Sequence, residues 1–555
     1  MVIIKTHHVH PSELVYLGDI IISSNLHSTP VTGDITILNY YAAKDNTNNG
    51  TTDSGFDSRS GIGTLIQFSA EKDLIISNRF NMINFGHSQT NIIKKTVWFP
   101  YLLYRNPHDY TKFRTLQIQP SLFCCFVVKN GNCSIRNDFF NFVSDNYSKV
   151  DSLSTVFNNK YDEDISTSSL FDPTYISALS KYKFMICFEN ESDPFYVTEK
   201  IGNAWLAGCI PIYWGMKDID HIVNKKCFIH VKSRNDFKSA LQRIIEIDTN
   251  FELYNQMRNQ PFFYYNKVPY VFSKKYYTNL INGLPRHDST TRKRVISYCL
   301  YGSDTGNVPV KKYILGAIRN AELSLIYYPD FILYFYIDTV SKYKVDQEIV
   351  NKLRSFSHVK IIEIDVSVYP NINFAKCLRF LPMDEPNVEI MLSRDTDSRF
   401  SWREANAVRE WINSGKQFHI IRDHPCHSNV ILGGAWASRK IKHFNWKKEM
   451  EVYTNMLNVW DVDQQFLKDK IYPLIKNEEC SMIHDNYFKY EKHATNFKDD
   501  YIDYSFVGEY VNYNEKDESS HGPEVLYSDS EETLFPIEVR GEEWKMIPRR
   551  IGYHP

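Results

Sequence analysis

The stretch Cys187–Gly215, which reads CFENESDPFYVTEKIGNAWLAGCIPIYWG, joins a polar loop, a short helical pattern and an apolar strand. The apolar run Lys183–Phe188 predicts a strand that ends directly before Glu189 and Asn190. Thr198 is a plausible N-cap for the helix that follows. In parallel α/β sheets, ligands bind beyond the carboxyl ends of the strands. The sequence therefore predicts a ligand site in this loop.

The alternation of apolar runs and helical patterns continues through both halves of the chain. Strands that alternate with helices indicate parallel sheets covered on both faces, so the predicted fold class is α/β. The predicted strands are Phe123–Val128, Lys183–Phe188, Cys209–Trp214 and Cys227–Val231 in the first half, and Val295–Tyr301, Phe331–Ile337, Val359–Ile364 and Val388–Ser393 in the second.

The composition is globular and carries no global charge bias. The chain has 555 residues, 43% of them apolar, and its 64 Lys and Arg nearly balance its 66 Asp and Glu. This length predicts two to four domains, and the balanced charge argues against nucleic acid or an anionic membrane as a partner. We expect no transmembrane segment, no signal peptide and a cytoplasmic location, with the ten Cys reduced and buried.

Three polar stretches divide the chain. Residues 43–61 predict a long loop, the basic stretch Gly283–Arg294 predicts a domain boundary, and the acidic stretch Asn512–Thr533 predicts a mobile segment. The predicted regions are accordingly 1–285, 293–505 and a partly disordered acidic segment, 506–555.

The polar residues near the opening loop have a chemistry that suits a nucleotide. A helix N-terminus carries free N–H groups and a partial positive charge, and Lys200 in its first turn adds a full charge, which suits phosphate. Arg136, in the opening turn of a helix after the strand Phe123–Val128, can grip a diphosphate bidentately. Glu199 can accept both hydroxyls of a ribose. Taken singly, such residues are also typical of a solvated helix face.

An ordered series of motifs gives these residues a family context. The series is FVVKNGNCSIRNDFF, YSKVDS, KYKFMICFEN, YVTEKI, IPIYWG and FIHV, followed by Asp236 and Phe237. In order and spacing, from about Phe123 to Phe263, it resembles the family 10 glycosyltransferases, the alpha-1,3/4-fucosyltransferases. The resemblance implies a GT-B fold whose Rossmann-like C-terminal half, here about 123–280, binds GDP-fucose.

The resemblance also implies a role for each matched residue. Arg136 and Lys200 would contact the diphosphate, Glu199 the ribose, and Asn190 and Tyr196 the nucleotide-sugar pocket. Because side chains would neutralise the leaving diphosphate, no metal is expected in this half.

The general base is matched less closely. Inverting transfer needs a carboxylate that takes the proton of the acceptor hydroxyl. The family's aromatic-x-x-Glu-Asn stretch corresponds at best to FSAEKD, so Glu71 is the candidate, and a Glu in a surface turn is the alternative interpretation. The expected acceptor is a glycan or glycoconjugate.

A second acidic group lies in the other half of the chain. VEIMLSRDTDSRFSWREANAVREW places Asp395 and Asp397 on a loop after a predicted strand. Two carboxylates one residue apart can hold Mg²⁺ or Mn²⁺ together with a substrate diphosphate. This is the DxD arrangement of GT-A glycosyltransferases, although a bare D-x-D is often only a turn.

The sequence around this motif also resembles a GT-A glycosyltransferase. VISYCLYG leads to Asp304 and a helix-spaced segment, as in the opening nucleotide-binding unit of that fold. Similar glycosyltransferases have a Gly-Gly acceptor loop, an Asp near an Asp-Gln pair and a late His that completes the metal shell. The resemblance assigns these features to Gly433 and Gly434, to Asp463 as a catalytic residue, and to His484 as a metal ligand.

The sequence thus predicts a bifunctional glycosyltransferase in which a GT-B region is fused to a GT-A region. The first half is expected to use GDP-fucose with inversion. The second half is expected to use Mn²⁺ or Mg²⁺ and a second nucleotide sugar. The competing hypothesis is a carbohydrate- or nucleotide-sugar-binding scaffold with one or both halves inactive. One further alternative is a zinc site of His419, His424 and His427, but their spacing fits no zinc motif. Another is a phosphatase or nuclease, but no D-x-D-G-T motif follows the first strand.

Overall fold

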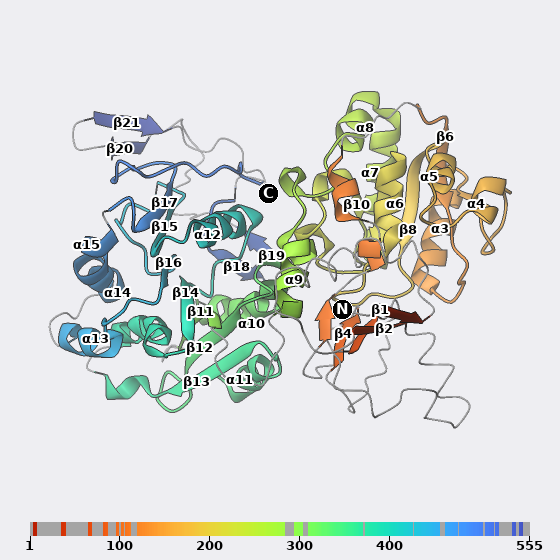
Figure 1. The fold of residues 1–555 in the computed structure, drawn as a ribbon. Helices are drawn as coiled ribbons and strands as arrows, with labels where there is room; N and C mark the ends of the chain where they lie inside the picture. Colours follow the sequence, from red (N-terminus) through yellow and green to blue (C-terminus); the bar gives the residue numbers. More distant parts are fainter. Residues whose placement is uncertain are drawn as a thin grey trace, which may run out of the picture. The chain divides into compact units, whose positions relative to one another are not determined.

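The computed structural model describes most of residues 101–514 and short strands outside that span (Figure 1). The chain divides into two compact units, Met1–Leu284 and Pro285–Pro555, here named unit 1 and unit 2. Within 101–514 the described segments are 101–104, 106–112, 119–282, 293–302, 309–369, 372–425, 427–454, 461–475, 477–502 and 505–514.

Unit 1 contains two five-stranded sheets, and the strand pairs of both are parallel. The first sheet, in spatial order, consists of β1 (Ile4–His7), β2 (Ile35–Asn39), β3 (Leu65–Phe68), β4 (Met82–Gly86) and β5 (Thr96–Trp98). The second, also in spatial order, consists of β10 (Ile229–His230), β9 (Ile210–Trp214), β8 (Tyr182–Phe188), β6 (Leu122–Phe126) and β7 (Asp151–Ser152).

Helices separate the strands of this second sheet and pack on it through aromatic side chains. The ring of Phe139 lies 4.9 Å from that of Phe188 at the end of β8, and 4.9 Å from that of Phe237. This packing fixes the helix starts near the carboxyl ends of the strands. The helices are α3 (Ser134–Asn146), α4 (Glu163–Thr167), α5 (Pro173–Leu179), α6 (Glu199–Ala207), α7 (Phe237–Thr249), α8 (Phe251–Arg258) and α9 (Lys274–Asn282).

Unit 2 is built on one seven-stranded mixed sheet. In spatial order it consists of β13 (Val359–Ile364), β12 (Ile332–Asp338), β11 (Lys293–Leu300), β14 (Val388–Arg394), β16 (Ala435–Arg439), β15 (Phe418–Arg422) and β17 (Ser481–Asp485). β16 is antiparallel to both of its neighbours, and the other neighbouring pairs are parallel.

The prediction of α/β architecture with parallel sheets is confirmed, with one correction in unit 2. The connection from β15 to β16 has no helix among its described residues. A parallel return normally needs a helical crossover, so the chain comes back antiparallel instead.

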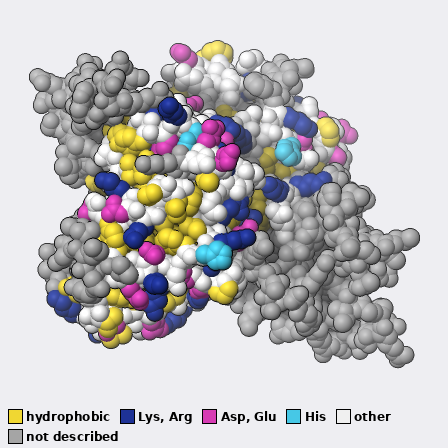
Figure 2. Space-filling model, turned by 60° about the vertical axis from the view of Figure 1, so that its left-hand side comes forward, with side chains coloured by type: hydrophobic (Ala, Val, Ile, Leu, Met, Phe, Trp, Pro, Cys, Tyr) yellow, Lys and Arg dark blue, Asp and Glu magenta, His cyan; other side chains and the backbone are white. Residues whose placement is uncertain are grey.

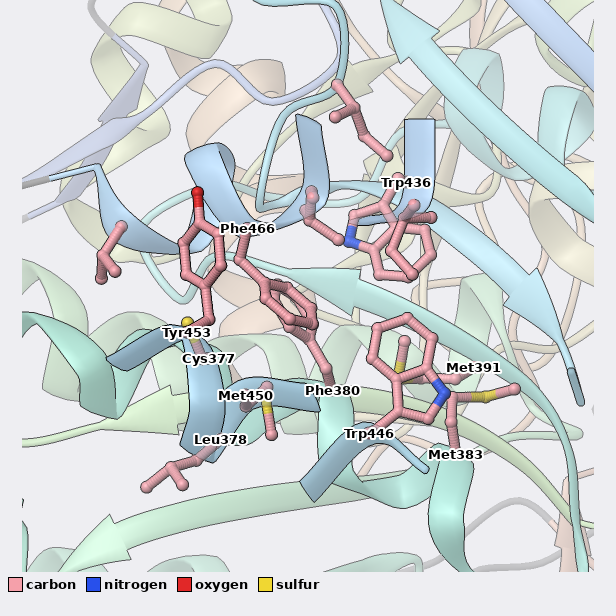
Figure 3. Close-up of a cluster of buried hydrophobic side chains, with 14 of the residues drawn as sticks. Cys377, Leu378, Phe380, Met383, Met391, Trp436, Trp446, Met450, Tyr453 and Phe466 are labelled. Atoms are coloured by element: carbon pink, nitrogen blue, oxygen red, sulfur yellow. The ribbon is translucent and has the colours of Figure 1, made fainter. Parts of the chain in front are cut away.

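Aromatic residues fill the core beside this sheet (Figure 3). The ring of Phe380 lies 5.5 Å from that of Trp436, 6.0 Å from that of Trp446 and 6.3 Å from that of Phe466. Phe380 belongs to the 3-10 segment η10 (Ile372–Asp384), which contacts β11 and β14. The same packing therefore holds its neighbour Arg379 against the sheet. The helices of unit 2 are α10 (Pro309–Tyr327), α11 (Gln347–Arg354), α12 (Trp402–Ser414), α13 (Trp446–Thr454), α14 (Val462–Phe466) and α15 (Tyr472–Ile475).

The last described part of unit 2 forms antiparallel strand pairs, and its first residues pack on the rest of the unit. Phe506, Val507 and Val511 are buried, and the N–H of Val511 donates to the carbonyl of Asp397 at 2.7 Å. The predicted limit at residue 505 therefore falls within a packed segment. The strands are β18 (Val511–Asn514), β19 (Asp517–Ser520), β20 (Phe535–Val539) and β21 (Glu543–Ile547).

The described surface carries mixed charge. On the face shown in Figure 2, Lys and Arg side chains are interspersed with Asp and Glu side chains. No helix in the described part of the chain has both the length and the hydropathy to span a membrane. Each described Cys is a free thiol, and all but Cys299 and Cys480 are buried.

Candidate active sites

A buried carboxylate, Glu189, lies just beyond the carboxyl end of β8. Glu189 has no exposed surface and accepts hydrogen bonds from the N–H and the hydroxyl of Thr198, each at 2.7 Å, and from Nζ of Lys200 at 3.1 Å. Burial raises the pKa of Glu189, while the charge of Lys200 opposes that shift. Glu189 therefore ties the start of α6 to the end of β8 and orients the loop between them.

Lys200 provides a fixed positive charge in the first turn of α6. Its Nζ donates to the hydroxyl of Thr198 at 2.9 Å and lies 3.9 Å from the carboxylate of Glu199. Burial lowers the pKa of Lys200, but the charges of Glu189 and Glu199 raise it by more, so the net pKa is raised. Thr198 occupies the predicted N-cap position, yet its hydroxyl donates to Glu189 and makes no capping bond.

The glycine that ends IPIYWG is required by the same contact. A Cβ on Gly215 would lie 2.5 Å from Cγ of Glu189 and 2.8 Å from the hydroxyl of Tyr213. Any side chain there would push Glu189 out of its position, because real Cβ atoms do not approach so closely. The end of β9 thus closes the pocket that holds this carboxylate.

Arg136, in the first turn of α3, is fully buried and contacts the end of β8. Its Nη1 donates to the carbonyls of Phe188 at 3.3 Å and Glu189 at 3.2 Å and to Oδ1 of Asn190 at 2.8 Å, and its Nη2 donates to the carbonyl of Asn130. Burial lowers its pKa. Its Nε is buried without a hydrogen-bond partner. A bidentate grip on a diphosphate therefore requires the guanidinium to exchange one of these oxygens for a ligand oxygen.

The residues predicted for the nucleotide site meet at one edge of the sheet. Arg136 contacts Asn190 directly, Lys200 lies next to Glu199, and the charge of Arg136 acts on Lys200. Tyr196 and Glu199 are buried, with 3% and 6% of their surface exposed. Lys200 is the predicted cation that keeps accessible surface, since 17% of its side chain is exposed.

Two predicted residues, Glu71 and Asp304, lie outside the described residues. Glu71 follows β3 in the sequence, and Asp304 follows β11. Their roles as general base and as nucleotide ligand stay predictions.

In unit 2 the DxD loop follows β14, at the point where the order of the sheet reverses. β11 has β12 on one side and β14 on the other, and such a switch point is where open α/β sheets bind ligands. Nδ2 of Asn320, from α10, donates to the carbonyls of Thr396 at 3.3 Å and Ser398 at 3.0 Å. The loop is therefore fixed to α10 at this position.

A guanidinium that the sequence analysis did not single out joins two predicted residues of unit 2. Nη1 of Arg379 pairs with Oδ1 of Asp395, and Nη2 pairs with Oδ2 of Asp463 at 2.6 Å. The side chains of Arg379 and Asp463 are 7% and 5% exposed, whereas that of Asp395 is 51% exposed. Burial opposes the charge of Arg379, but the two carboxylates outweigh it and raise its pKa.

The predicted Gly-Gly loop packs directly against this bridge. A Cβ on Gly433 would overlap the Asp463 carboxylate and the Arg379 guanidinium, and a Cβ on Gly434 would overlap the Asp395 carboxylate. Only glycine permits this approach of the backbone. The structure thus brings four predicted residues together around Arg379.

Asp397 pairs with a different cation. Nζ of Lys312, from α10, lies 3.0 Å from Oδ2 of Asp397 and 4.6 Å from the ring centre of Tyr510. Burial and the charge of Asp395 raise the pKa of Asp397, and Lys312 lowers it. The two carboxylates of the loop therefore repel each other, and their oxygens are suitable ligands for Mg²⁺ or Mn²⁺.

His484 does not join this loop. It lies in β17, which β16 and β15 separate from β14. Its Nδ1 is 2.8 Å from Nε2 of His419 and its Nε2 is 3.8 Å from Glu410, and burial lowers its pKa to about 4. Among the described residues, the group of three or more His, Cys, Asp or Glu side chains that lie close enough together to share a metal ion consists of Asp218, Asp220 and His221.

The three histidines considered for zinc are also not gathered. His419 stacks on Trp411 with 5.5 Å between ring centres, whereas His424 and His427 lie against Phe506, at 4.0 Å and 5.5 Å. His419 also shares a hydrogen bond with His484, and Nδ1 of His427 accepts one from the N–H of Asp423 at 3.4 Å.

Comparisons with known proteins concern one part of the chain. Residues 117–281 match the family described as Glycosyltransferase family 10 (fucosyltransferase) C-term. A fucosyltransferase-named protein of Acanthamoeba polyphaga mimivirus is 34% identical over 181 residues, which cover 32% of this chain and 30% of the relative. The alpha-(1,3)-fucosyltransferase FucT of Helicobacter pylori is 33% identical over 140 residues, which cover 24% of this chain and 26% of the relative. The chain thus spans less than a third of each of these relatives.

A solved structure of an alpha1,3-fucosyltransferase with GDP shares 18% identity and a TM-score of 0.36, covering 51% of this chain and 89% of the other. The family match covers β6 to β10 and the loops that carry Arg136 and Lys200. Residues 117–281 are therefore similar to the C-terminal part of the glycosyltransferase family 10 (fucosyltransferase) proteins.

Proposed function

We propose that unit 1 transfers fucose from GDP-fucose to a glycan acceptor with inversion, and that it has a GT-B fold. The observation that carries the proposal is the charge of Lys200, fixed at the N-terminus of α6 by Glu189, inside the segment that matches family 10. A helix N-terminus with an adjacent ammonium suits the diphosphate of a nucleotide sugar.

The proposed chemistry uses side chains of unit 1 alone. Lys200 and the free N–H groups of α6 bind the diphosphate, and Arg136 exchanges its Asn190 contact for a diphosphate oxygen. Glu199 accepts the ribose hydroxyls. The acceptor oxygen forms a bond to the anomeric carbon of fucose while the bond between that carbon and GDP breaks. Glu71 takes the proton of the acceptor hydroxyl. Both cations stabilise the departing GDP, which is where negative charge develops.

The release of GDP from GDP-fucose tests this proposal on the full-length protein. Arg136→Ala is expected to lower the rate by about 100-fold, because it removes a preorganised cation from the leaving group. Arg234→Ala is the matched control, since Arg234 pairs with Asp138 on the surface, where both side chains are about half exposed. Equal rates for the Arg136 variant and the control would contradict the proposal.

For unit 2, we propose a second nucleotide-sugar transferase of GT-A type. The observation that favours it is the convergence of Asp395, Asp463 and the Gly433-Gly434 loop beside the switch point of the sheet. Asp395 and Asp397 would hold Mg²⁺ or Mn²⁺, which would supply positive charge to the leaving diphosphate. Asp463 faces the Gly-Gly loop and would orient the acceptor.

Thermal unfolding of the full chain with a panel of nucleotide sugars, with and without Mn²⁺, tests the second transferase. A ligand that binds the folded state raises the melting temperature. At least one nucleotide sugar should do so in a manner that depends on Mn²⁺ and is lost in Asp395→Asn. Hydrolysis of that nucleotide sugar then separates the enzyme from the alternative, a nucleotide-sugar-binding scaffold, which binds without turnover.

A further inference from the structure

The guanidinium of Arg379 lies between two carboxylates of unit 2. Its guanidinium pairs with Asp395 on one side and with Asp463 on the other, and Nη1 also donates to the carbonyl of Arg394 at 3.3 Å. Gly433 and Gly434 press against the same atoms. Both carboxylates are therefore neutralised from within the chain.

The two halves of this bridge differ in solvent access. Asp463 and Arg379 are buried together, and separating a buried pair leaves an uncompensated charge at high cost. Asp395 is half exposed, so water can replace Arg379 as its partner. The Asp395 half of the bridge is the one that can open.

We propose that Arg379 is the internal counter-ion of this site, and that a divalent cation binds Asp395 by displacing Arg379 from it, while Arg379 stays on Asp463. The inference rests on the proposed second transferase for its biological purpose. Its physical content concerns metal affinity alone. Arg379 acts through Asp395 and Asp463 and is a positioning residue.

If Arg379 is a counter-ion, its removal should strengthen metal binding and not weaken it. An arginine that merely builds a metal site weakens metal binding when it is removed, because the carboxylates lose their positions. A competing counter-ion has the opposite effect, since the carboxylates regain their full negative charge. At the short distance of an ion pair, one charge more or less changes a cation's affinity by roughly tenfold or more.

Mn²⁺ alone, titrated into the full-length protein and followed by the electron paramagnetic resonance signal of the free ion, tests the proposal. Arg379→Gln is expected to bind Mn²⁺ at least about tenfold more tightly than the wild type. Arg379→Lys keeps a charge in the buried position, but one ammonium cannot bridge both carboxylates, so a smaller shift in the same direction is expected. Arg439→Gln, at a partly buried Arg that pairs with Glu389, is the control and leaves the affinity unchanged.

The lysine variant keeps the test informative if the glutamine variant fails to fold. Unchanged or weaker Mn²⁺ binding in the Arg379 variants overturns the proposal, as does the absence of Mn²⁺ binding from every variant. Tighter binding that persists in Asp395→Asn/Arg379→Gln also overturns it, because the ion then binds elsewhere. Tighter binding together with no hydrolysis of any nucleotide sugar supports the counter-ion and rejects the second transferase.

Discussion

In both sites a buried carboxylate is paired with a basic side chain, but the two sites differ in how far apart the partners lie in the sequence. In unit 1 the buried carboxylate of Glu189 is paired with Lys200, eleven residues away in the sequence. In unit 2 the buried carboxylate of Asp463 is paired with Arg379, which lies 84 residues away. In the first site, one loop and the helix that follows it supply both partners. The second exists only after the sheet and η10 have packed.

This comparison predicts that the loss of a cation is most costly where the carboxylate has no solvent. Lys200→Met leaves Glu189 buried and unpaired, so the free energy of unfolding at pH 7 should fall by about 4 kcal/mol. Urea unfolding measures it. Glu189→Gln/Lys200→Met is the matched control, and it should recover part of the loss because no buried charge remains. A double variant as unstable as the single one would show that Lys200 stabilises by packing.

The buried His484 is expected to make unit 2 sensitive to acid. Its pKa falls from the ordinary 6.5 to about 4 on folding, so the unfolded chain takes up a proton first as the pH falls. Its contribution is present above pH 6.5 and is lost between about pH 6.5 and 4. The wild type should lose about 3 kcal/mol more than His484→Gln over this range. Parallel pH profiles of the two proteins would contradict the buried, neutral histidine.

Arg379→Gln should lower the free energy of unfolding by about 3 kcal/mol, less than Lys200→Met, because Asp463 is left buried and unpaired whereas Asp395 is half exposed and can be hydrated. Mn²⁺ should restore part of this loss, since a ligand that binds only the folded state stabilises it. No such rescue is expected for Lys200→Met. Melting curves with and without Mn²⁺ measure both effects, and equal rescue of the two variants would remove the distinction between the sites.

The smallest effect is expected at the surface. Asp138→Asn removes the partner of Arg234, but both side chains are about half exposed, so the change should stay below about 1 kcal/mol. Urea unfolding checks it. A larger loss would mean that this pair fixes α3, and with it the position of Arg136.

Sequence reasoning succeeded where the signal was local. The strand before Glu189 and the helix after Thr198 follow from periodicity and short spacing. That Arg136 and Asn190, 54 residues apart, belong to one site was implied by the family resemblance and not by spacing. Arg379 could not be predicted as a site residue, because it lies in an apolar segment and its acidic partners are 16 and 84 residues away. His484 was grouped with Asp395 because the order of strands in the sheet, which places β16 and β15 between them, cannot be read from spacing.

The buried state of Arg136 could also not be predicted. Its place in the opening turn of α3 was evident, but the carbonyl oxygens that surround it come from Asn130, Phe188 and Glu189, whose approach depends on the register of β6 with β8. The structure therefore changes how this cation must act, because it has to exchange partners before it can bind a ligand.

In the proposed reaction, unit 1 uses GDP-fucose through its own cations and without a metal. GDP release from GDP-fucose by the full-length protein, measured with and without a chelator for wild type, Arg136→Ala and Asp395→Ala, tests it most directly. We expect turnover that resists chelation, persists in Asp395→Ala and is lost in Arg136→Ala. Turnover that disappears on chelation, or survives the loss of Arg136, would contradict it.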